Sequence, residues 1–242
     1  MIKQYVPDKT KLNIFKKIFW DVATSLHIAS VIRLVSSKDS YLRDQGWFKS
    51  VNKAKSVGKK GEPLPWLTYP FINFIEPRLN QTLTMFEYGS GNSTLWFAQR
   101  VGEIDSVEHD KAWFNEIAPK MPANAKLTLR EVDTAENYSA ITFMSFTDEV
   151  PYSLEVKSKG KLYDIILIDG IYRNNSVSNS VSVLNPTGVI IIDNVDYVES
   201  NESTEFLKSQ GFRRVDFWGM CPLVYHDSCT AIFYKDNNCL GL

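Results

Sequence analysis

An acidic residue lies at or just after the end of each of several short apolar segments of this chain. Glu87, Glu108, Asp133, Asp169 and Asp193 each lie at or just after the end of such a segment. In parallel sheets the carboxyl ends of the strands share one edge, and ligands bind there. Like charges repel, so a purely structural protein has little reason to gather acids at that edge. The spacing therefore predicts a functional site formed by these strand ends.

A glycine-rich turn follows the first of these acids. Glycine allows backbone angles that other residues resist, and it lets a ligand approach the main chain. The turn leads into a predicted helix, whose free N–H groups and dipole favour an anion. We expect cofactor contacts from Gly89, Ser90, Gly91, Asn92 and Ser93. The anion would be the pyrophosphate of a dinucleotide or the carboxylate of S-adenosylmethionine.

Two features distinguish these cofactors. Thr94 stands where the third glycine of a dinucleotide fingerprint belongs, which disfavours NAD. The negative charge of Glu87 would repel a phosphate, whereas it suits the ammonium and sulfonium groups of S-adenosylmethionine. Glu108, followed by His109 at the same edge, lies 17 residues beyond Gly91, where a carboxylate can accept hydrogen bonds from ribose hydroxyls. A nicotinamide-dependent oxidoreductase stays the alternative enzyme.

The motifs resemble those of a known family. Residues 86–91, Phe-Glu-Tyr-Gly-Ser-Gly, resemble the first motif of class I S-adenosylmethionine-dependent methyltransferases. Glu108 matches their second motif, and residues 163–170 resemble their fourth. The resemblance covers about residues 80–235. It implies methyl transfer from S-adenosylmethionine, a seven-stranded sheet whose last strand is antiparallel, and an adenine contact near Asp133.

A second resemblance concerns a metal. Asp169 together with Asp193 and Asn194 is similar to the metal ligands of catechol- and caffeoyl-CoA-type O-methyltransferases. Such oxygen ligands suit Mg²⁺, which would lower the pKa of a substrate hydroxyl. This chain has Tyr172 and Arg173 where that family has a lysine, and it more closely resembles methyltransferases of bacterial polysaccharide clusters. In the other hypothesis, Asp169 holds the cofactor and Asp193 with Asn194 shapes the site.

Catalysis would need few groups, because the methyl group of a sulfonium is already activated. The main task is to position a nucleophile. A hydroxyl acceptor also has to lose its proton, and the candidate bases are Asp169, Tyr172 and His109. Arg173 would bind an anionic substrate or stabilise developing charge. The predicted acceptor is an oxygen of a small molecule or a glycan.

Alternating apolar segments define the elements that hold these residues. The expected strands are 83–88, 104–108, 126–132, 163–168, 189–192, 212–217 and 230–234, and the expected helices are 66–79, 93–100, 111–121, 177–184 and 202–209. Repeated strand–helix units predict an α/β, Rossmann-like, doubly wound sheet. We assign this methyltransferase domain to residues 66–242.

Residues 1–65 form a predicted N-terminal helical extension and linker. Residues 14–35 are apolar at helical spacing, but lack the uninterrupted run of about 20 apolar residues that a spanning helix needs. This segment could pack on the domain, lie in a membrane interface or form a homodimer contact. As a docking helix, it would also suit a non-catalytic partner protein. Residues 51–65 are basic and contain Gly and Pro, as in a solvated linker.

Composition and charge limit the classes of protein to which this chain can belong. The 242 residues carry 27 Lys and Arg against 28 Asp and Glu, a balance that disfavours a nucleic-acid partner. The hydrophobic share of 44% and the charged share of 23% are those of a globular protein. Three cysteines without a C-x-x-C pair suggest neither disulfides nor zinc. We expect a cytoplasmic protein, with peripheral membrane contact as an option.

Overall fold

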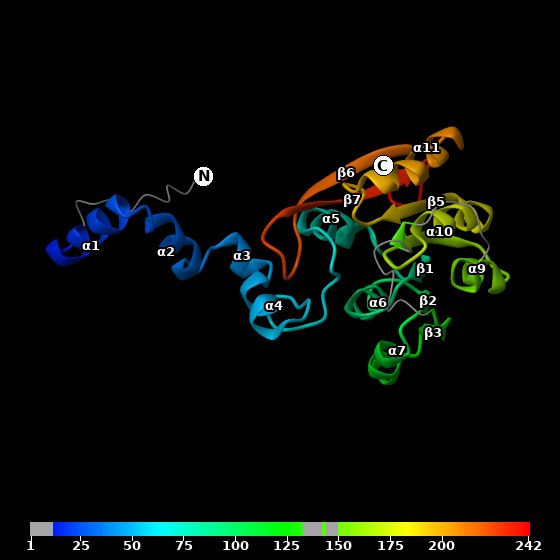
Figure 1. Ribbon diagram of the computed structural model, residues 1–242, viewed down its shortest axis with the longest axis horizontal. Helices are drawn as coiled ribbons and strands as arrows, with labels where there is room; N and C mark the ends of the chain where they lie inside the picture. Colours follow the sequence, from blue (N-terminus) through cyan, green and yellow to red (C-terminus); the bar gives the residue numbers. More distant parts are fainter. Residues whose placement is uncertain (1–11, 133–141, 144–149) are drawn as a thin grey trace.

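A mixed seven-stranded sheet forms the centre of the part of the chain that the structure describes, in the order β3-β2-β1-β4-β5-β7-β6 (Figure 1). The computed structural model describes residues 12–132, 142–143 and 150–242. The strands are β1 (Thr84–Tyr88), β2 (Glu103–Glu108), β3 (Ala125–Leu129), β4 (Tyr163–Ile168), β5 (Leu184–Ile192), β6 (Arg213–Met220) and β7 (Asp227–Tyr234). Strand β7 runs antiparallel to β5 and β6, and the other pairs are parallel. The predicted Rossmann-like sheet with an antiparallel last strand is confirmed.

The register of the central strands brings their carboxyl ends level. Tyr88 pairs with Ile168, and Ile168 pairs with Ile192. The residue after each of these positions therefore lies at the same edge of the sheet. Strand β4 consists mainly of fully buried aliphatic residues, as expected for a strand covered by helices on both faces. Asp169 and Asp193 thus leave neighbouring strands at the same height.

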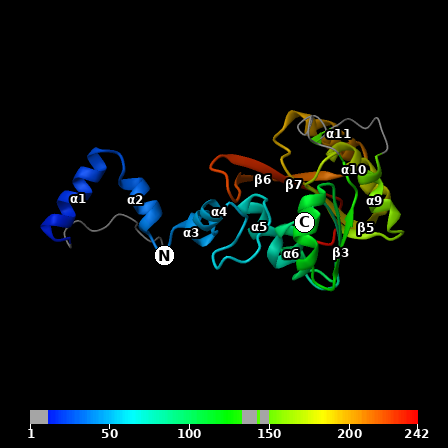
Figure 2. The same cartoon turned by 60° about the horizontal axis from the view of Figure 1, so that its bottom comes forward.

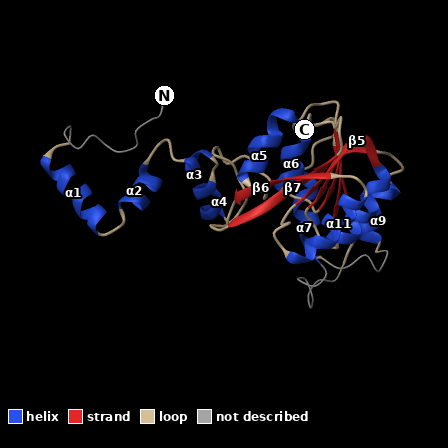
Figure 3. Ribbon diagram, turned by 90° about the horizontal axis from the view of Figure 1, so that it is seen from above, coloured by secondary structure: helices blue, strands red, loops and turns tan. Residues whose placement is uncertain are grey.

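Helices cover both faces of the sheet. Helices α5 (Tyr69–Ile75) and α6 (Asn92–Ala98) contribute to one hydrophobic cluster. Helices α9 (Pro151–Ser158), α10 (Arg173–Ser180) and α11 (Asn201–Ser209) contribute to the other. Figure 3 shows the sheet in red between α5 and α6 on one side and α9 and α11 on the other. Helix α7 (Lys111–Ile117) follows β2.

The N-terminal region has two structurally different parts. Helices α1 (Ile14–Ser25) and α2 (Ala29–Ser36) extend away from the body, whereas α3 (Tyr41–Asp44) and α4 (Trp47–Lys53) connect them to it (Figures 1 and 2). The indole Nε1 of Trp47 donates to the carbonyl oxygen of Val224, between β6 and β7, at 2.7 Å. The expected linker is not fully solvated, because Ser56 and Val57 are buried. The predicted boundary at residue 65 stays a prediction.

The N-terminal helices are short. Over the described residues, no single helix combines the length and the apolar composition needed to cross a membrane. The segments Ile14–Ser25 and Ala29–Asp44, taken together, have the necessary length and apolar composition. The two segments are bent by 117° relative to each other. The break lies where His27 adopts a positive φ of 56°.

Candidate functional site

The glycine turn after β1 is held between two neighbours. Gly89 has a φ of +90°, and a Cβ placed there would lie 2.9 Å from the carbonyl oxygen of Asp169. On the other side, a Cβ on Gly91 would lie 3.5 Å from the Trp113 ring, whose Nε1 donates to the carbonyl oxygen of Ser90 at 2.7 Å. The turn therefore needs glycine at position 89 for conformation and for space.

Glu108 holds this turn to the end of β2. Its Oε2 accepts from the backbone N–H of Ser90 at 3.1 Å and from the Ser90 hydroxyl at 2.7 Å. Its Oε1 accepts from the N–H groups of His109 and Asp110 at 2.8 and 2.9 Å. Burial favours a raised pKa, but these donors and the His109 ring outweigh it and lower the pKa of Glu108 below its ordinary value. The carboxylate is therefore ionised at neutral pH.

A cavity of about 450 Å³ opens over the glycine turn. It is lined by Gly89, Ser90, Ser93, Glu108, His109, Asp110, Trp113, Asp169 and Gly170. Most of the predicted cofactor residues thus come together in this cofactor cavity. Asp133 lies outside the described residues.

Glu87 lies beneath the turn. Its side chain is fully buried and lines neither this cavity nor the larger one described below. It accepts hydrogen bonds from the hydroxyls of Thr94 and Ser106. Burial raises the pKa of Glu87 to about 7, although the neighbouring hydroxyls oppose the shift. Glu87 therefore supports the turn from below, without the direct access to the cavity that we expected.

A larger cavity of about 680 Å³ adjoins the first and shares Ser90, Ser93, Trp113 and Asp169 with it. We call it the acceptor cavity. The predicted residues Gly91 and Asn92 also line it. Its other walls include aromatic rings, uncharged polar groups and charged groups of both signs, among them Trp66, Tyr197, Asn194, His226, Ser228, Lys55, Glu116, Lys120, Arg173, Asp193 and Asp196. Trp66 and Tyr197 are half exposed, so their rings are accessible to a ligand.

The buried guanidinium of Arg173 connects the ends of β4 and β5. Its Nε donates to the carbonyl oxygen of Gly170 at 2.9 Å, and its Nη1 donates to that of Asp193 at 2.6 Å. Nη1 also reaches Oδ1 of Asn194 at 3.1 Å, and Nη2 reaches Oδ1 of Asp169 at 3.3 Å. Only the planar fork of arginine can serve four acceptors in this arrangement.

This arrangement does not support the predicted Mg²⁺ site. The amide oxygen of Asn194 and one carboxylate oxygen of Asp169 already accept hydrogen bonds from Arg173, and Asp193 Oδ1 accepts from the Thr230 hydroxyl at 2.6 Å. Within the described part of the chain, no cluster of three or more His, Cys, Asp or Glu side chains is suited to a metal ion. The cation between these strand ends is the guanidinium of Arg173.

The two aspartates have raised pKa values. Burial, followed by the charge of Asp193, raises the pKa of Asp169 well above its ordinary value, against the opposing effect of Arg173. Burial also raises the pKa of Asp193 to about 6, while Arg173 and Thr230 oppose the shift. Because the charges interact, the pair titrates as a unit, and it can accept a proton near neutral pH.

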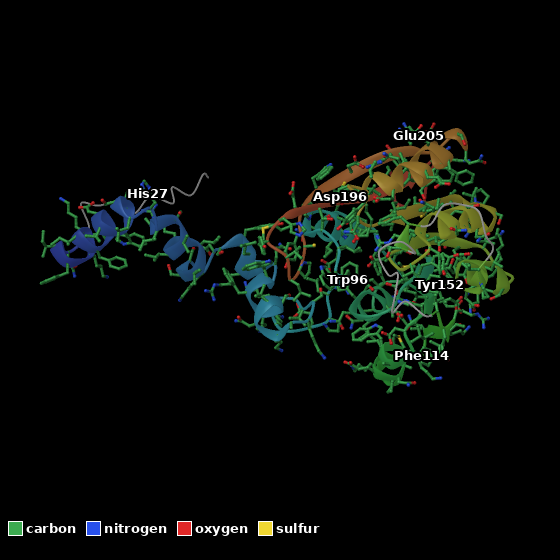
Figure 4. All side chains as sticks on the ribbon, viewed as in Figure 1. His27, Trp96, Phe114, Tyr152, Asp196 and Glu205 are labelled. Atoms are coloured by element: carbon green, nitrogen blue, oxygen red, sulfur yellow. The ribbon has the colours of Figure 1, made fainter. Side chains whose placement is uncertain are left out.

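The other predicted catalytic residues are separated. Arg173 and Asp169 line the acceptor cavity, but Tyr172 lines neither cavity. The Tyr172 ring lies toward Tyr152, with ring centroids 6.5 Å apart. Figure 4 shows Tyr152 apart from Asp196, which lines the acceptor cavity. His109 lines the cofactor cavity, so of the three candidate bases only Asp169 faces both cavities.

Sequence reasoning did not identify Trp113 or the segment 54–56 as site residues. Asp110 caps α7 by accepting from the N–H groups of Ala112 and Trp113, which places the indole one turn into the helix, over the glycine turn. A capping residue two positions after a strand-end acid was a usable signal. No local signal existed for residues 54–56, which reach the acceptor cavity through contacts such as the 2.6 Å hydrogen bond from Asn92 Nδ2 to the carbonyl oxygen of Ser56.

No protein-family model matches the chain, and no curated protein matches it by sequence. Among solved structures it is similar to precorrin-6y C5,15-methyltransferase from Geobacter metallireducens GS-15, with 15% identity, 76% of this chain and 96% of that chain covered, and a TM-score of 0.48. A methyltransferase-like protein from Silicibacter pomeroyi has 19% identity, 72% and 90% coverage and a TM-score of 0.47. A putative methyltransferase from Streptococcus mutans in complex with SAH has 10% identity, 67% and 94% coverage and a TM-score of 0.46. Likenesses at this level do not establish a family for the chain.

Proposed function

We propose that this protein transfers the methyl group of S-adenosylmethionine to an oxygen atom of a small molecule or glycan. One observation carries the proposal: two adjoining cavities share the wall formed by Ser90, Ser93, Trp113 and Asp169. A group-transfer enzyme needs donor and acceptor sites that meet at one point. The strand ends supply that point.

The cofactor cavity has the groups that S-adenosylmethionine requires. The ionised carboxylate of Glu108 can accept hydrogen bonds from ribose hydroxyls, in place of the Ser90 hydroxyl that it now binds. The backbone of the glycine turn is open to the amino-acid part of the ligand. Asp169 lines this cavity, and its carboxyl oxygens can accept hydrogen bonds from an ammonium group. When bound, this cofactor supplies an already activated methyl group.

The acceptor cavity suits a hydroxyl-bearing ligand. Trp66 and Tyr197 offer ring faces, on which sugars or aromatic rings can stack. Asp196, Asn194 and His226 offer hydrogen-bonding groups around them. Accessible rings beside hydrogen-bonding groups and charged groups of both signs suit a hydroxyl-bearing small molecule or glycan.

Proton removal is assigned to the pair of aspartates. Both line the acceptor cavity, and the pKa of Asp193 is raised to about 6, close to the working pH of a general base. Arg173 touches both strand ends, so it keeps the pair in place and limits the rise of their pKa values. The hydroxyl proton would pass to this pair as the oxygen attacks the methyl group.

Cofactor binding can be tested by isothermal titration with S-adenosylhomocysteine. Glu108→Ala removes the ribose acceptor and should weaken binding at least about tenfold, since a charge-assisted hydrogen bond is worth about 1.5–3 kcal/mol. Glu131→Ala is the matched control, because this acid is exposed, lines neither cavity and forms a surface ion pair with Lys111. Binding of NADH in place of S-adenosylhomocysteine, or equal binding by both variants, would refute the assignment.

Transfer itself can be tested with labelled S-adenosylmethionine and a panel of glycans and small hydroxyl compounds. Asp193→Asn should lower kcat at least about tenfold, because positioned bases commonly contribute 10²–10⁴-fold. It should leave the Kd for S-adenosylhomocysteine within about twofold, because Asp193 does not line the cofactor cavity. Full activity in this variant would contradict the role of the pair.

A further inference from the structure

Helix α1 has an apolar face that the body does not cover. Its large apolar side chains, with the residue that follows the helix, are all more than half exposed: Ile14, Phe15, Ile18, Phe19, Val22 and Leu26. At about 100° per residue they occupy an arc of about 140°. Lys16, Lys17 and Asp21 lie outside this arc. A surface helix of a globular protein normally turns such a face toward the core.

Helix α2 continues the pattern. Ile28, Val31, Leu34 and Val35 are between 42% and 57% exposed. Among the described residues, ten of the eighteen exposed large apolar side chains lie between residues 14 and 35. Both helices extend clear of the sheet and its covering helices in Figures 1 and 2. Apolar exposure of this extent marks a surface that has a partner.

Charge indicates the kind of partner. Residues 1–60 carry 13 Lys and Arg against 4 Asp and Glu, whereas residues 61–242 carry 14 against 24. The near-neutral total therefore hides a basic N-terminal segment joined to an acidic body. Lys49 and Lys53 continue the basic character along α4, and both are exposed.

We propose that residues 14–36 are an interfacial anchor that lies on an anionic lipid membrane. Amphipathic helices with aromatic and aliphatic residues on one face and lysines beside it bind such surfaces, by apolar burial together with attraction to acidic headgroups. This proposal stands independently of methyl transfer.

The dimensions favour lying on the membrane over crossing it. Helix α1 has 12 residues, and at about 1.5 Å per residue it is about 18 Å long, against about 30 Å for the hydrocarbon core. The bend of 117° between the helices gives a shape that suits a surface. Arg33 stacks on the Trp20 ring at 4.9 Å and ties the two helices together.

A second copy of the chain is a poorer occupant of this face. A symmetric dimer through α1 would bring the same surface of two chains together. The basic segments of both chains would then lie close to each other and repel. An acidic lipid surface offers the opposite charge and has no such cost.

The test is flotation of the full chain with phosphatidylcholine vesicles that contain or lack phosphatidylglycerol. We expect binding to the anionic vesicles and at least about tenfold weaker binding to the neutral ones. Phe15→Ser combined with Phe19→Ser should lower the partition coefficient at least about tenfold, and Lys16→Gln combined with Lys17→Gln should lower it about tenfold. Leu162→Ser is the matched control, since Leu162 is an exposed apolar residue on the body, 49% accessible.

Circular dichroism checks that each variant is folded. Size-exclusion chromatography with light scattering, without lipid, tests the competing occupant. A stable dimer that the double Phe variant dissociates, together with absence of vesicle binding, would overturn the proposal. Equal binding to neutral and anionic vesicles, or binding unaffected by both double variants, would overturn it as well.

Discussion

Removing the guanidinium of Arg173 should destabilise the protein, and the size of the loss should depend on pH. Arg173→Met keeps much of the volume but removes hydrogen bonds to Gly170, Asp193, Asn194 and Asp169. It also leaves the raised-pKa carboxyls of both aspartates without their cation. Breaking a buried ion pair by removing one partner costs about 3–5 kcal/mol. We expect a loss of that size in the free energy of unfolding near neutral pH.

The pH dependence follows from the direction of these shifts. A carboxyl whose pKa is raised in the folded state binds more protons there than in the unfolded chain, so stability falls as pH rises toward the folded pKa. For Asp193 this range runs from its ordinary value, 3.8, to about 6. Without Arg173 both pKa values rise further, and the fall extends to higher pH. The cost of Arg173→Met should therefore be larger at about pH 8 than at about pH 5, where only the lost hydrogen bonds contribute.

Urea unfolding followed by tryptophan fluorescence at several pH values measures this difference. Arg173→Lys is the matched control, because it keeps the charge but cannot serve the same four acceptors, and it should lie between wild type and Arg173→Met. Adding Asp193→Asn to Arg173→Met should recover part of the loss at high pH. A loss that is the same at both pH values, or no recovery in the double variant, would refute the electrostatic reasoning.

Three further changes test the turn and its support. Glu87→Gln removes a buried acid whose pKa is raised to about 7. The free energy of unfolding of the wild type should therefore fall as pH rises from about 4.5 to 7, and that of the variant should fall less. The same pH dependence for both proteins in urea unfolding would contradict this. In Gly89→Ala the new residue has to adopt a positive φ, and its Cβ lies 2.9 Å from a carbonyl oxygen. We therefore expect a loss of about 1–3 kcal/mol in the free energy of unfolding, measured by thermal unfolding, and weaker S-adenosylhomocysteine binding, measured by titration. Trp113→Phe removes the donor to the Ser90 carbonyl and should weaken titrated S-adenosylhomocysteine binding about three- to tenfold, and unchanged affinity would show that the indole does not hold the turn.

Helix α10 shows where hydrophobic patterning failed. We expected a helix at 177–184, whereas α10 spans Arg173–Ser180 and buries several polar side chains. Two of these are held by partners distant in the chain: Asn174 donates to the carbonyl oxygen of Glu199 at 3.2 Å, and Asn179 donates to Ser153 at 3.3 Å. Periodicity detects apolar faces, so it misses a helix whose buried face is polar and hydrogen-bonded. Strand β4, which is apolar and β-branched, was predicted at the observed residues.

The candidate site likewise has a part that the sequence predicts and a part that it does not. The acids at the strand ends could be predicted to converge, because parallel strands end at one edge of the sheet. The hydrogen bonds that Arg173 donates could not be predicted from the sequence. Half of their acceptors are backbone carbonyl oxygens, which residue types do not reveal. The resemblance to metal-dependent enzymes led to Mg²⁺ for the same reason: the oxygen ligands were visible in the sequence, but the hydrogen bonds from Arg173 to the side chains of Asp169 and Asn194 were not.

The separation of charge along the chain makes this molecule a strong electric dipole. Helices α1 and α2, which belong to the basic part of the sequence, lie at one end of an elongated shape, and the acidic sheet domain lies at the other (Figure 1). The electric field of an anionic surface exerts a torque on such a dipole and turns the basic end toward that surface before any contact forms. Because the Debye length is about 8 Å at physiological ionic strength, this alignment acts only over the last nanometre of approach. Salt would therefore change how fast the protein is captured more than how firmly its apolar side chains hold.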